Sequence, residues 1–387
     1  MKNTLNYLSN KAICAVFAAL WVLTVMGAEY VWTGAAGDGK WITPANWDVK
    51  VDDGSGEVSW EAATTYPGTS GVKDENGKYT ATVKFTNSVE CIDLEGKSIY
   101  LADKGDNSGE QALRMQSGIS VKLKNGFIYV AFKDVSADKD IYTLGASGST
   151  NIFDGVKFRG RTSSGDTTGV VFNLQPNEKS TVIYDGDNTI DWIHYPKKAH
   201  TMIVRNGTTT ISKQPVDCAT GTVLWVTNAI LKYTINNSYA IAKKIYFRDG
   251  EDRPAQILHP NAMAANVAGQ MNIIVPQDGR STPFIECAMH GTADSLKKSK
   301  IDFVLDVTNW KKGGEENKIP LLHFTQQRDN AAVMETKINY ISLTVLAQGE
   351  NPKITTRRNA RLEWVPSDLT LYYVQDKPSD GFKVIVR

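Results

Sequence analysis

The amino-acid sequence predicts an all-β chain that winds as a right-handed, single-stranded parallel β-helix, also called a β-solenoid. Short runs rich in Val, Ile, Tyr, Phe and Thr recur from Thr80 onwards, and Gly, Asn, Asp and Ser separate them. Turns of similar composition return at a nearly constant step, as stacked coils require. Helical periodicity is nearly absent, and Pro260–Ala268 is the one candidate for a short helix. We therefore expect a row of coils that is closed by a cap at each end.

Residues 1–28 have the three-part form of a secretory signal peptide. Lys2 and Lys11 lie in a polar start, an apolar run covers Ala12–Met26, and Gly27-Ala28 offers a small-residue cleavage site. The run is shorter than the roughly 20 residues that a membrane-spanning helix needs, so cleavage is preferred over a membrane anchor. Cleavage would remove two lysines and change the formal charge from +1 to −1. We expect a secreted protein, periplasmic, cell-surface or extracellular, with neither a nucleic-acid partner nor a membrane span.

The segment 29–78 is predicted to close the N-terminal end of the solenoid. It carries Trp32, Trp41 and Trp47 within sixteen residues, each beside a turn signal, and Asn46 precedes the last of them. Three indoles bury about 150–250 Å² each, so this short piece is expected to fold over something larger. We interpret the four residues as a structural cap, because the open end of a solenoid is otherwise a template for aggregation.

The segment 79–270 is predicted to form the coils. Asn or Asp followed by Gly or Ala lies between two short strands six times, at Asn125, Asp154, Asp185, Asn206, Asn228 and Asp249. The steps between these turns are 29, 31, 21, 22 and 21 residues, so the last three suit single coils and the longer ones suit coils with loop insertions. An antiparallel β-sandwich is the rival fold, because Asn-Gly between strands is also a hairpin signal. The regular step favours the solenoid.

The expected strands of these coils follow from the same pattern. They are Thr80–Phe85, Ser98–Leu101, Ile119–Leu123, Phe127–Ala131, Gly169–Leu174, Thr181–Tyr184, Met202–Arg205, Thr208–Ile211, Val223–Thr227, Ile230–Thr234 and Ile245–Arg248. The segment 271–387 has longer apolar runs, and we expect it to form the final coils and a C-terminal β cap. Its last part, Trp364–Arg387, is expected to add a hairpin that turns at residues 378–381.

The opening VWTGAAGDGKWITPANWD, the later Tyr66-Pro67-Gly68 and the strand TATVKF resemble the start of secreted bacterial β-helix repeat proteins of the autotransporter-passenger type. The closing PFIEC, KIDFVLDV and IPLLHF resemble the last coils of such passengers. The resemblance implies a secreted β-helix with an adhesive or surface role. A translocator barrel would follow in an autotransporter, and this sequence ends at Arg387, so self-export through an outer membrane is not expected.

Two groups of residues are candidates for chemistry. Asp185, Asp187 and Asp191 alternate near one turn, where they could bind Ca²⁺ or supply an acid and a base. Arg159 and Arg161 could take the part of the basic residue in a β-helix polysaccharide lyase. A solvated turn and a polar insertion loop would contain the same residue types, and we prefer these structural interpretations.

Several aromatic residues fall in or beside the repeats and could stack on sugar rings, although packing in the core is their commoner use. They are Trp192, Tyr195, Trp225, Tyr233, Tyr239 and Tyr246. Cys91, Cys218 and Cys287 remain after signal removal, an odd number that we interpret as buried apolar residues rather than as a disulfide framework. His290 lies close to Cys287, but sequence neighbours rarely form a catalytic pair, so a structural role is preferred.

These observations favour a non-catalytic β-helix protein with a structural, adhesive or glycan-contacting role at the cell surface. Its expected partners are glycans or other cell-surface components, and no cofactor is expected unless Ca²⁺ binds at the aspartates. The alternative is a Ca²⁺-assisted polysaccharide lyase or a glycoside hydrolase of the β-helix type. The sequence leaves the ligand and the oligomeric state open.

Overall fold

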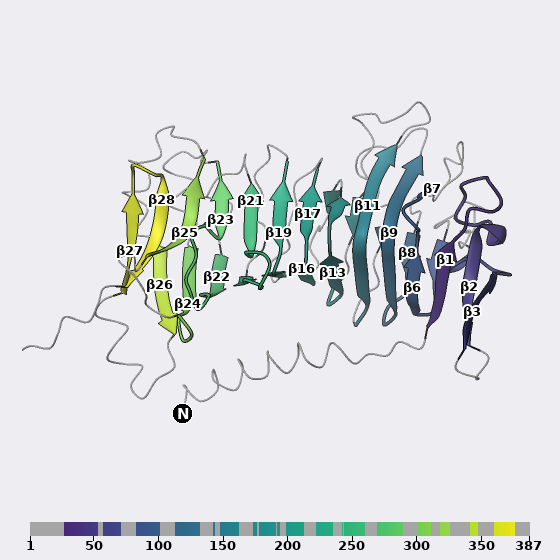
Figure 1. Ribbon diagram of the computed structural model, residues 1–387, viewed down its shortest axis with the longest axis horizontal. Coiled ribbons are helices and arrows are strands. Elements are labelled where there is room, and N and C mark those ends of the chain that lie inside the picture. Colours follow the sequence, from purple (N-terminus) through teal and green to yellow (C-terminus); the bar gives the residue numbers. More distant parts are fainter. Residues whose placement is uncertain are drawn as a thin grey trace, which may run out of the picture.

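The chain is all-β and its strands are mostly parallel, as the sequence predicts, and one single-turn 3₁₀ helix, η1 (Pro44–Asn46), is the one helix among the described residues. Figure 1 shows the strands stacked side by side along the long axis, and between the two ends they follow the order of the chain. This arrangement is that of a β-solenoid. The computed structural model describes residues 27–52, 57–70, 83–100, 113–131, 142–143, 148–161, 173–175, 178–190, 192–193, 199–212, 222–234, 242, 244–259, 269–288, 301–310, 318–325, 341–346 and 360–375.

The strands fall into three groups, which we call the first, second and third faces. The first face holds β6 (Val89–Asp93), the first half of β9 (Ser120–Ala131), the first half of β11 (Thr150–Arg161), β13 (Thr181–Asp185), β16 (Thr201–Arg205), β18 (Val223–Thr227), β20 (Lys244–Arg248), β22 (Gly269–Ile274), β24 (Ile301–Asp306) and β26 (Ile341–Leu346). All of these pair in parallel with their neighbours on this face.

The other two faces complete the coils. The second face holds β7 (Ser98–Tyr100), the second halves of β9 and β11, β14 (Asn188–Ile190), β17 (Thr208–Ile211), β19 (Ile230–Tyr233), β21 (Gln256–His259), β23 (Ile285–Cys287) and β25 (Lys318–Phe324). The third face holds β5 (Val83–Phe85), β8 (Leu113–Met115), β10 (Tyr142–Thr143), β12 (Asn173–Gln175) and β15 (Trp192–Ile193), with β4 (Thr69–Ser70) antiparallel to β5.

The strand register confirms the repeat that the sequence indicates. Val182 pairs with Met202, Met202 with Leu224, and Leu224 with Ile245, so each step along the chain is one coil. The expected strands Thr208–Ile211 and Val223–Thr227 coincide with β17 and β18. One difference is that residues 120–131 form a single bent strand, β9, where two strands were expected.

The corners between the first and second faces explain why Asn recurs. Asn125, Asn206 and Asn228 have φ angles of 54°, 57° and 50°, in the left-handed region that Asn tolerates better than most residues. The Nδ2 of Asn206 donates to the Asp185 carboxylate at 2.9 Å, and the Nδ2 of Asn228 donates to Asn206 Oδ1 at 3.3 Å. The corners therefore stack on one another and help to fix the register of neighbouring coils.

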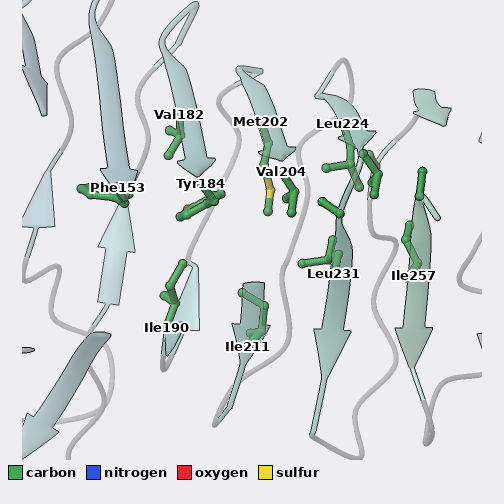
Figure 2. Close-up of a cluster of buried hydrophobic side chains, with 14 of the residues drawn as sticks. Phe153, Val182, Tyr184, Ile190, Met202, Val204, Ile211, Leu224, Leu231 and Ile257 are labelled. Carbon is green, nitrogen blue, oxygen red and sulfur yellow. The ribbon is translucent and has the colours of Figure 1, made fainter. Parts of the chain in front are cut away.

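The core runs along the inside of the solenoid. One inward row on the first face pairs Phe153, Tyr184, Val204, Val226 and Phe247 in succession, and each is at most 1% exposed. Figure 2 shows how such side chains from the first and second faces meet in the interior. Burying one large apolar side chain contributes about 1.5–3 kcal/mol, so each coil is stabilised chiefly by contact with the next.

The N-terminal segment forms an antiparallel sheet that continues the first face. Strands β1 (Ala28–Trp32), β2 (Trp47–Asp52) and β3 (Val58–Ala62) lie side by side, and β1 also pairs in parallel with β6. Among the described strands, β3 pairs only with β2, and all five of its residues are exposed. Glu61 pairs with Val49, which packs against the core, so it puts a charge on the inner side of this edge strand. Such a charge discourages further strands from pairing there.

The C-terminal end is covered by a hairpin. Strands β27 (Ala360–Val365) and β28 (Thr370–Gln375) are antiparallel, and β28 pairs with β25. The expected hairpin turn at 378–381 lies outside the described residues, and the hairpin that the structure describes turns earlier, at residues 366–369. A chain reversal at Pro366-Ser367-Asp368 is consistent with the turn preference of these residue types. Cys287 is fully buried in the core, whereas Cys218, His290 and Pro260–Ala268 lie outside the described residues.

Candidate functional site

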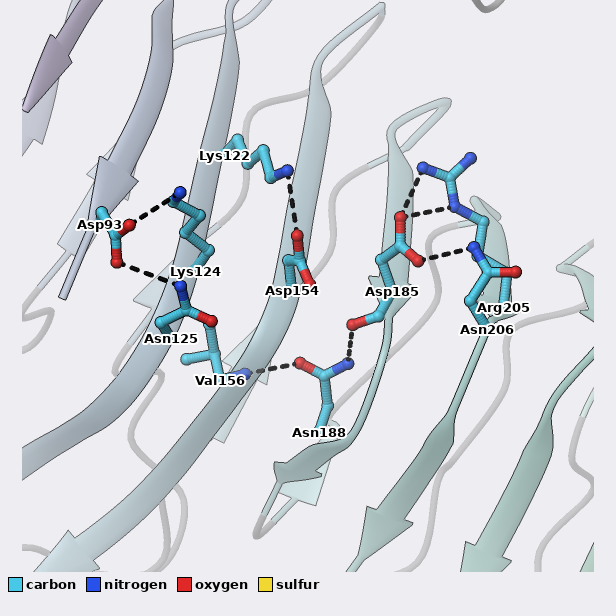
Figure 3. Close-up of polar contacts among 10 residues, drawn as sticks. All are labelled: Asp93, Lys122, Lys124, Asn125, Asp154, Val156, Asp185, Asn188, Arg205 and Asn206. Atoms are coloured by element: carbon cyan, nitrogen blue, oxygen red, sulfur yellow. Dashed lines mark hydrogen bonds and ion pairs between the residues drawn. The ribbon is translucent and has the colours of Figure 1, made fainter. Parts of the chain in front are cut away.

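The structure places Asp185 at a corner, where it holds the next coil. Its carboxylate accepts hydrogen bonds from Arg205, at 2.9 Å from Nε and 2.7 Å from Nη2, and from Asn206 Nδ2 at 2.9 Å (Figure 3). The backbone carbonyl of Asp185 accepts from the buried Asn188, whose Oδ1 in turn accepts from Val156 N at 2.9 Å. These bonds join three successive coils, so Asp185 has a structural role at this corner.

Asp187 is held differently. It accepts from the backbone N–H of Thr208 at 2.7 Å, lies 3.9 Å from an Arg253 nitrogen, and has a side chain that is 78% exposed. Asp191 lies outside the described residues. Among the described residues, no three His, Cys, Asp or Glu side chains gather closely enough to hold a metal ion.

Arg159 and Arg161 lie at the end of β11, on the second face. Their backbones pair with Tyr129 and Ala131 of β9, and nothing is described of their side chains. The described basic partner of Asp185 is Arg205, which is one coil further along the chain. The structure therefore does not bring the predicted aspartates and these arginines together within its described part.

The four predicted cap residues lie together at the N-terminal end. Trp41, Trp47 and Asn46 are fully buried and Trp32 is 5% exposed. The ring centroids of Trp47 lie 4.9 Å from those of Trp32 and 5.0 Å from those of Trp41, in edge-to-face contact. Trp47 Nε1 donates to Trp41 O and Trp41 Nε1 donates to Pro67 O, so two of the indoles are also hydrogen-bonded. With no exposed face, these rings cannot stack on a ligand.

The aromatic residues of the repeats point in two directions. Tyr233 is inward, 1% exposed, and stacks on His259 at 4.4 Å. Trp225 and Tyr246 alternate with buried core residues and face outwards, with ring centroids 3.9 Å apart and an interplanar angle of 10°. Because each ring covers a face of the other, and Ile203 precedes Trp225 in the same row, this pair presents edges rather than faces to solvent. It suits coil stacking better than sugar stacking.

A pocket of about 360 Å³ lies at the N-terminal end of the first face, where β1, β2 and β3 meet β6 and β9. Its lining residues come from separate parts of the chain and are Glu29, Tyr30, Val31, Asp48, Trp60, Cys91, Asp93, Glu95 and Lys124. The strand register brings them together: Val31 is the partner of both Asp48 and Asp93, and Asp93 is the partner of Lys124. Ile92 of β6 points into the core. Most of the lining side chains point to the other side of the sheet, which is the outer surface of the solenoid.

The aromatic wall of this pocket is exposed. Trp60 lies on β3 and is 47% exposed, whereas Trp41 and Trp47 nearby are fully buried. A large apolar side chain left in water on the wall of a concavity is a common feature of ligand sites. This role of Trp60 could not be predicted from the sequence, because β3 has the alternation of an ordinary edge strand and the neighbours of Trp60 in the pocket are distant in the chain.

Acidic side chains outnumber basic side chains in the described lining of the pocket. Four carboxylates and one ammonium line it. Lys124 Nζ lies 2.7 Å from the Asp93 carboxylate, and this hydrogen bond raises the pKa of Lys124. Glu29 is paired with Lys50, which lies beside Trp60 in the register. Two carboxylates, those of Asp48 and Glu95, have no ion-pair partner among the described residues, so acidic side chains outnumber basic ones in the described lining.

Cys91 also lines the pocket, and it is not suited to nucleophilic chemistry there. Burial raises the pKa of its thiol, although Lys124 and Lys122 act in the opposite direction. The thiol is therefore neutral at neutral pH, whereas the thiolate is the nucleophile. An exposed indole, carboxylate acceptors and a concave surface are features that small-ligand sites commonly combine.

Comparison with known protein families, with curated proteins and with solved structures finds no match to this chain. Within the described part of the chain, no helix has the length and hydrophobicity needed to cross a bilayer.

Proposed function

We propose that this protein is a secreted or cell-surface, non-catalytic, right-handed parallel β-helix that contacts glycans through the pocket beside Trp60. In this proposal it serves an adhesive or structural role, as the resemblance to autotransporter passengers implies. The observation that carries the proposal is the 47% exposed indole of Trp60 on the wall of a pocket that also offers the carboxylates of Asp48 and Glu95, which have no ion-pair partner among the described residues. Aromatic faces pack on the C–H groups of sugar rings, and carboxylates accept hydrogen bonds from sugar hydroxyls.

The size of the pocket agrees with this role. A volume near 360 Å³ lies at the lower end of the range of about 300–1,000 Å³ that is typical of small-ligand sites, enough for a short stretch of a glycan. A site at one end of a long solenoid leaves the rest of the molecule as a spacer, which suits a protein that holds a surface at a distance.

The alternative, a Ca²⁺-assisted lyase or glycoside hydrolase, has less support. Asp185 is tied to Arg205 and Asn206, and Asp187 is tied to Thr208, so these carboxylates are already used in contacts between coils. A catalytic acid and base need freedom to meet a substrate.

A binding experiment separates these possibilities. Purified mature protein is passed over immobilised neutral, amine-bearing and uronate-containing glycans, with and without Ca²⁺, and both retention and released product are measured. We expect retention without cleavage, and loss of retention in Trp60→Ala. Val58→Ala is the matched control, because Val58 is on the same strand, is 50% exposed and does not line the pocket. Product release, or no retention on any glycan, would overturn the proposal.

A further inference from the structure

The charge and shape of the pocket beside Trp60 indicate which glycans it would take. We propose that the pocket binds an amine-bearing saccharide, such as a glucosamine unit, whose ring packs on Trp60 and whose protonated amino group is attracted by the carboxylates of Asp48 and Glu95 further along the pocket. This inference rests on the glycan-contact function proposed above and names its ligand class.

Four carboxylates line the pocket, and the described ion pairs neutralise two of them: Asp93 is 2.7 Å from Lys124, and Glu29 is paired with Lys50. The carboxylates of Asp48 and Glu95 remain. A neutral sugar would leave their charge unbalanced, and a uronate would be repelled by it, whereas an ammonium group would neutralise it.

The exposed indole of Trp60 can also attract a cation. A cation over the face of a tryptophan is attracted by the negative face of the ring, and this attraction adds to that of the carboxylates. Trp60 is on the edge strand β3, is 47% exposed, and pairs with Lys50, whose ammonium is tied to Glu29. Its exposed indole therefore offers the same surface to a sugar ring and to the amino group that the ring carries.

An amino sugar and a lysine side chain would use the pocket differently. A lysine side chain would satisfy the carboxylates alone, but it carries no ring to cover an indole. A saccharide amine supplies both a ring and a charge, which uses the whole wall of the pocket. We therefore favour the amino sugar over a basic peptide.

Two β-1,4-linked oligosaccharides of equal length form the test, one of glucosamine and one of N-acetylglucosamine, which differ in the charge of the amine. Binding is measured by titration calorimetry on the whole mature protein, at a pH where the sugar amine is protonated. We expect the glucosamine oligomer to bind about tenfold more tightly, because a charge-assisted hydrogen bond is lost on acetylation. Its affinity should fall as salt is added.

Three variants locate the site. Asp48→Asn and Glu95→Gln should each weaken binding of the glucosamine oligomer by about tenfold and leave the acetylated oligomer unaffected. Trp60→Ala should weaken binding of both. Glu61→Gln is the matched control: Glu61 is an exposed acid next to Trp60 in the chain that does not line the pocket, so binding should not change.

The outcomes distinguish the two proposals. Equal affinity for the two oligomers, with dependence on Trp60, would overturn the preference for amines and leave glycan contact standing. Tighter binding of oligolysine than of the glucosamine oligomer, without dependence on Trp60, would overturn the inference in favour of a basic peptide. No binding of any glycan would overturn the proposed function as well.

Discussion

The guanidinium of Arg280 lies 2.8 Å from the carboxylate of Asp249, and both side chains are largely buried, at 4% and 13% exposed. Asp249 also accepts from Ala255 N at 2.7 Å, and the guanidinium lies 3.7 Å from the centroid of the Phe284 ring. Burial lowers the pKa of Arg280 to about 10, against the opposite effect of Asp249. This ion pair therefore holds the last of the six corners to the loop before β23.

We expect Arg280→Ala to lower the free energy of unfolding by about 3–5 kcal/mol, because it leaves the Asp249 carboxylate buried without its partner. Arg205→Ala is the matched control. The pair of Arg205 with Asp185 is more exposed, at 32% and 18%, so its loss should cost about 1 kcal/mol or less. Denaturant midpoints of the two variants decide the matter, and equal losses would contradict the expectation.

Removing a buried indole from the cap should be more costly than removing the exposed one. Trp41→Ala deletes a fully buried ring that contacts Trp47 and Phe85 and donates to Pro67 O, and we expect a loss of about 3–5 kcal/mol. Trp60→Ala should change the midpoint little. Thermal unfolding of both variants is the measurement, and an unchanged midpoint for Trp41→Ala would show that the cap does not stabilise the coils.

The corner glycine Gly207 is packed against the previous corner. A Cβ at this position would lie 2.1 Å from the carbonyl carbon of Gly186, a backbone atom that cannot move aside. We expect Gly207→Ala to destabilise by about 3 kcal/mol through overpacking. Gly118→Ala, in open space with φ +78°, isolates the cost of a left-handed backbone at about 1 kcal/mol. Comparable losses in the two variants would argue against close stacking of the corners.

The fold could be predicted because its signals are local and repeated. Each Asn or Asp corner marks the same place in a coil, and three corners confirm this by positive φ at Asn125, Asn206 and Asn228. The lengths of the strands were harder to predict than their positions, because residues 120–131 continue through the corner at Asn125 as one strand. Turn-forming residues can interrupt a run of strand-forming residues in the sequence without interrupting the hydrogen-bonded ladder of the sheet.

The pocket could not be predicted, because it depends on pairing rather than on any motif. Glu29, Asp48, Trp60 and Cys91 are distant in sequence, and only the register of β1, β2, β3 and β6 brings them to one surface. By contrast, the conspicuous Asp185 and Asp187 are engaged at a corner. Carboxylates near a turn are commonly used to satisfy backbone and side-chain donors, so their clustering in sequence is weak guidance to a site.

Acidification should destabilise the protein through His259. Its imidazole is 2% exposed and stacks on Tyr233, and burial lowers its pKa from 6.5 to about 4. The folded protein therefore prefers the neutral ring, whereas the unfolded chain binds a proton below its ordinary pKa. The stabilisation is fully present above pH 6.5 and is lost as the pH falls towards 4, by roughly 3 kcal/mol in all.

The test is the denaturant midpoint measured between neutral pH and pH 4 for the natural protein and for His259→Phe. Phenylalanine keeps an aromatic ring against Tyr233 but cannot take up a proton. We expect the natural protein to lose stability over this range more steeply than the variant, and parallel pH profiles would show that His259 does not carry the effect. His323, which is near Thr370 at 3.0 Å and less buried, remains in both proteins, so the difference between the profiles reports on His259 alone.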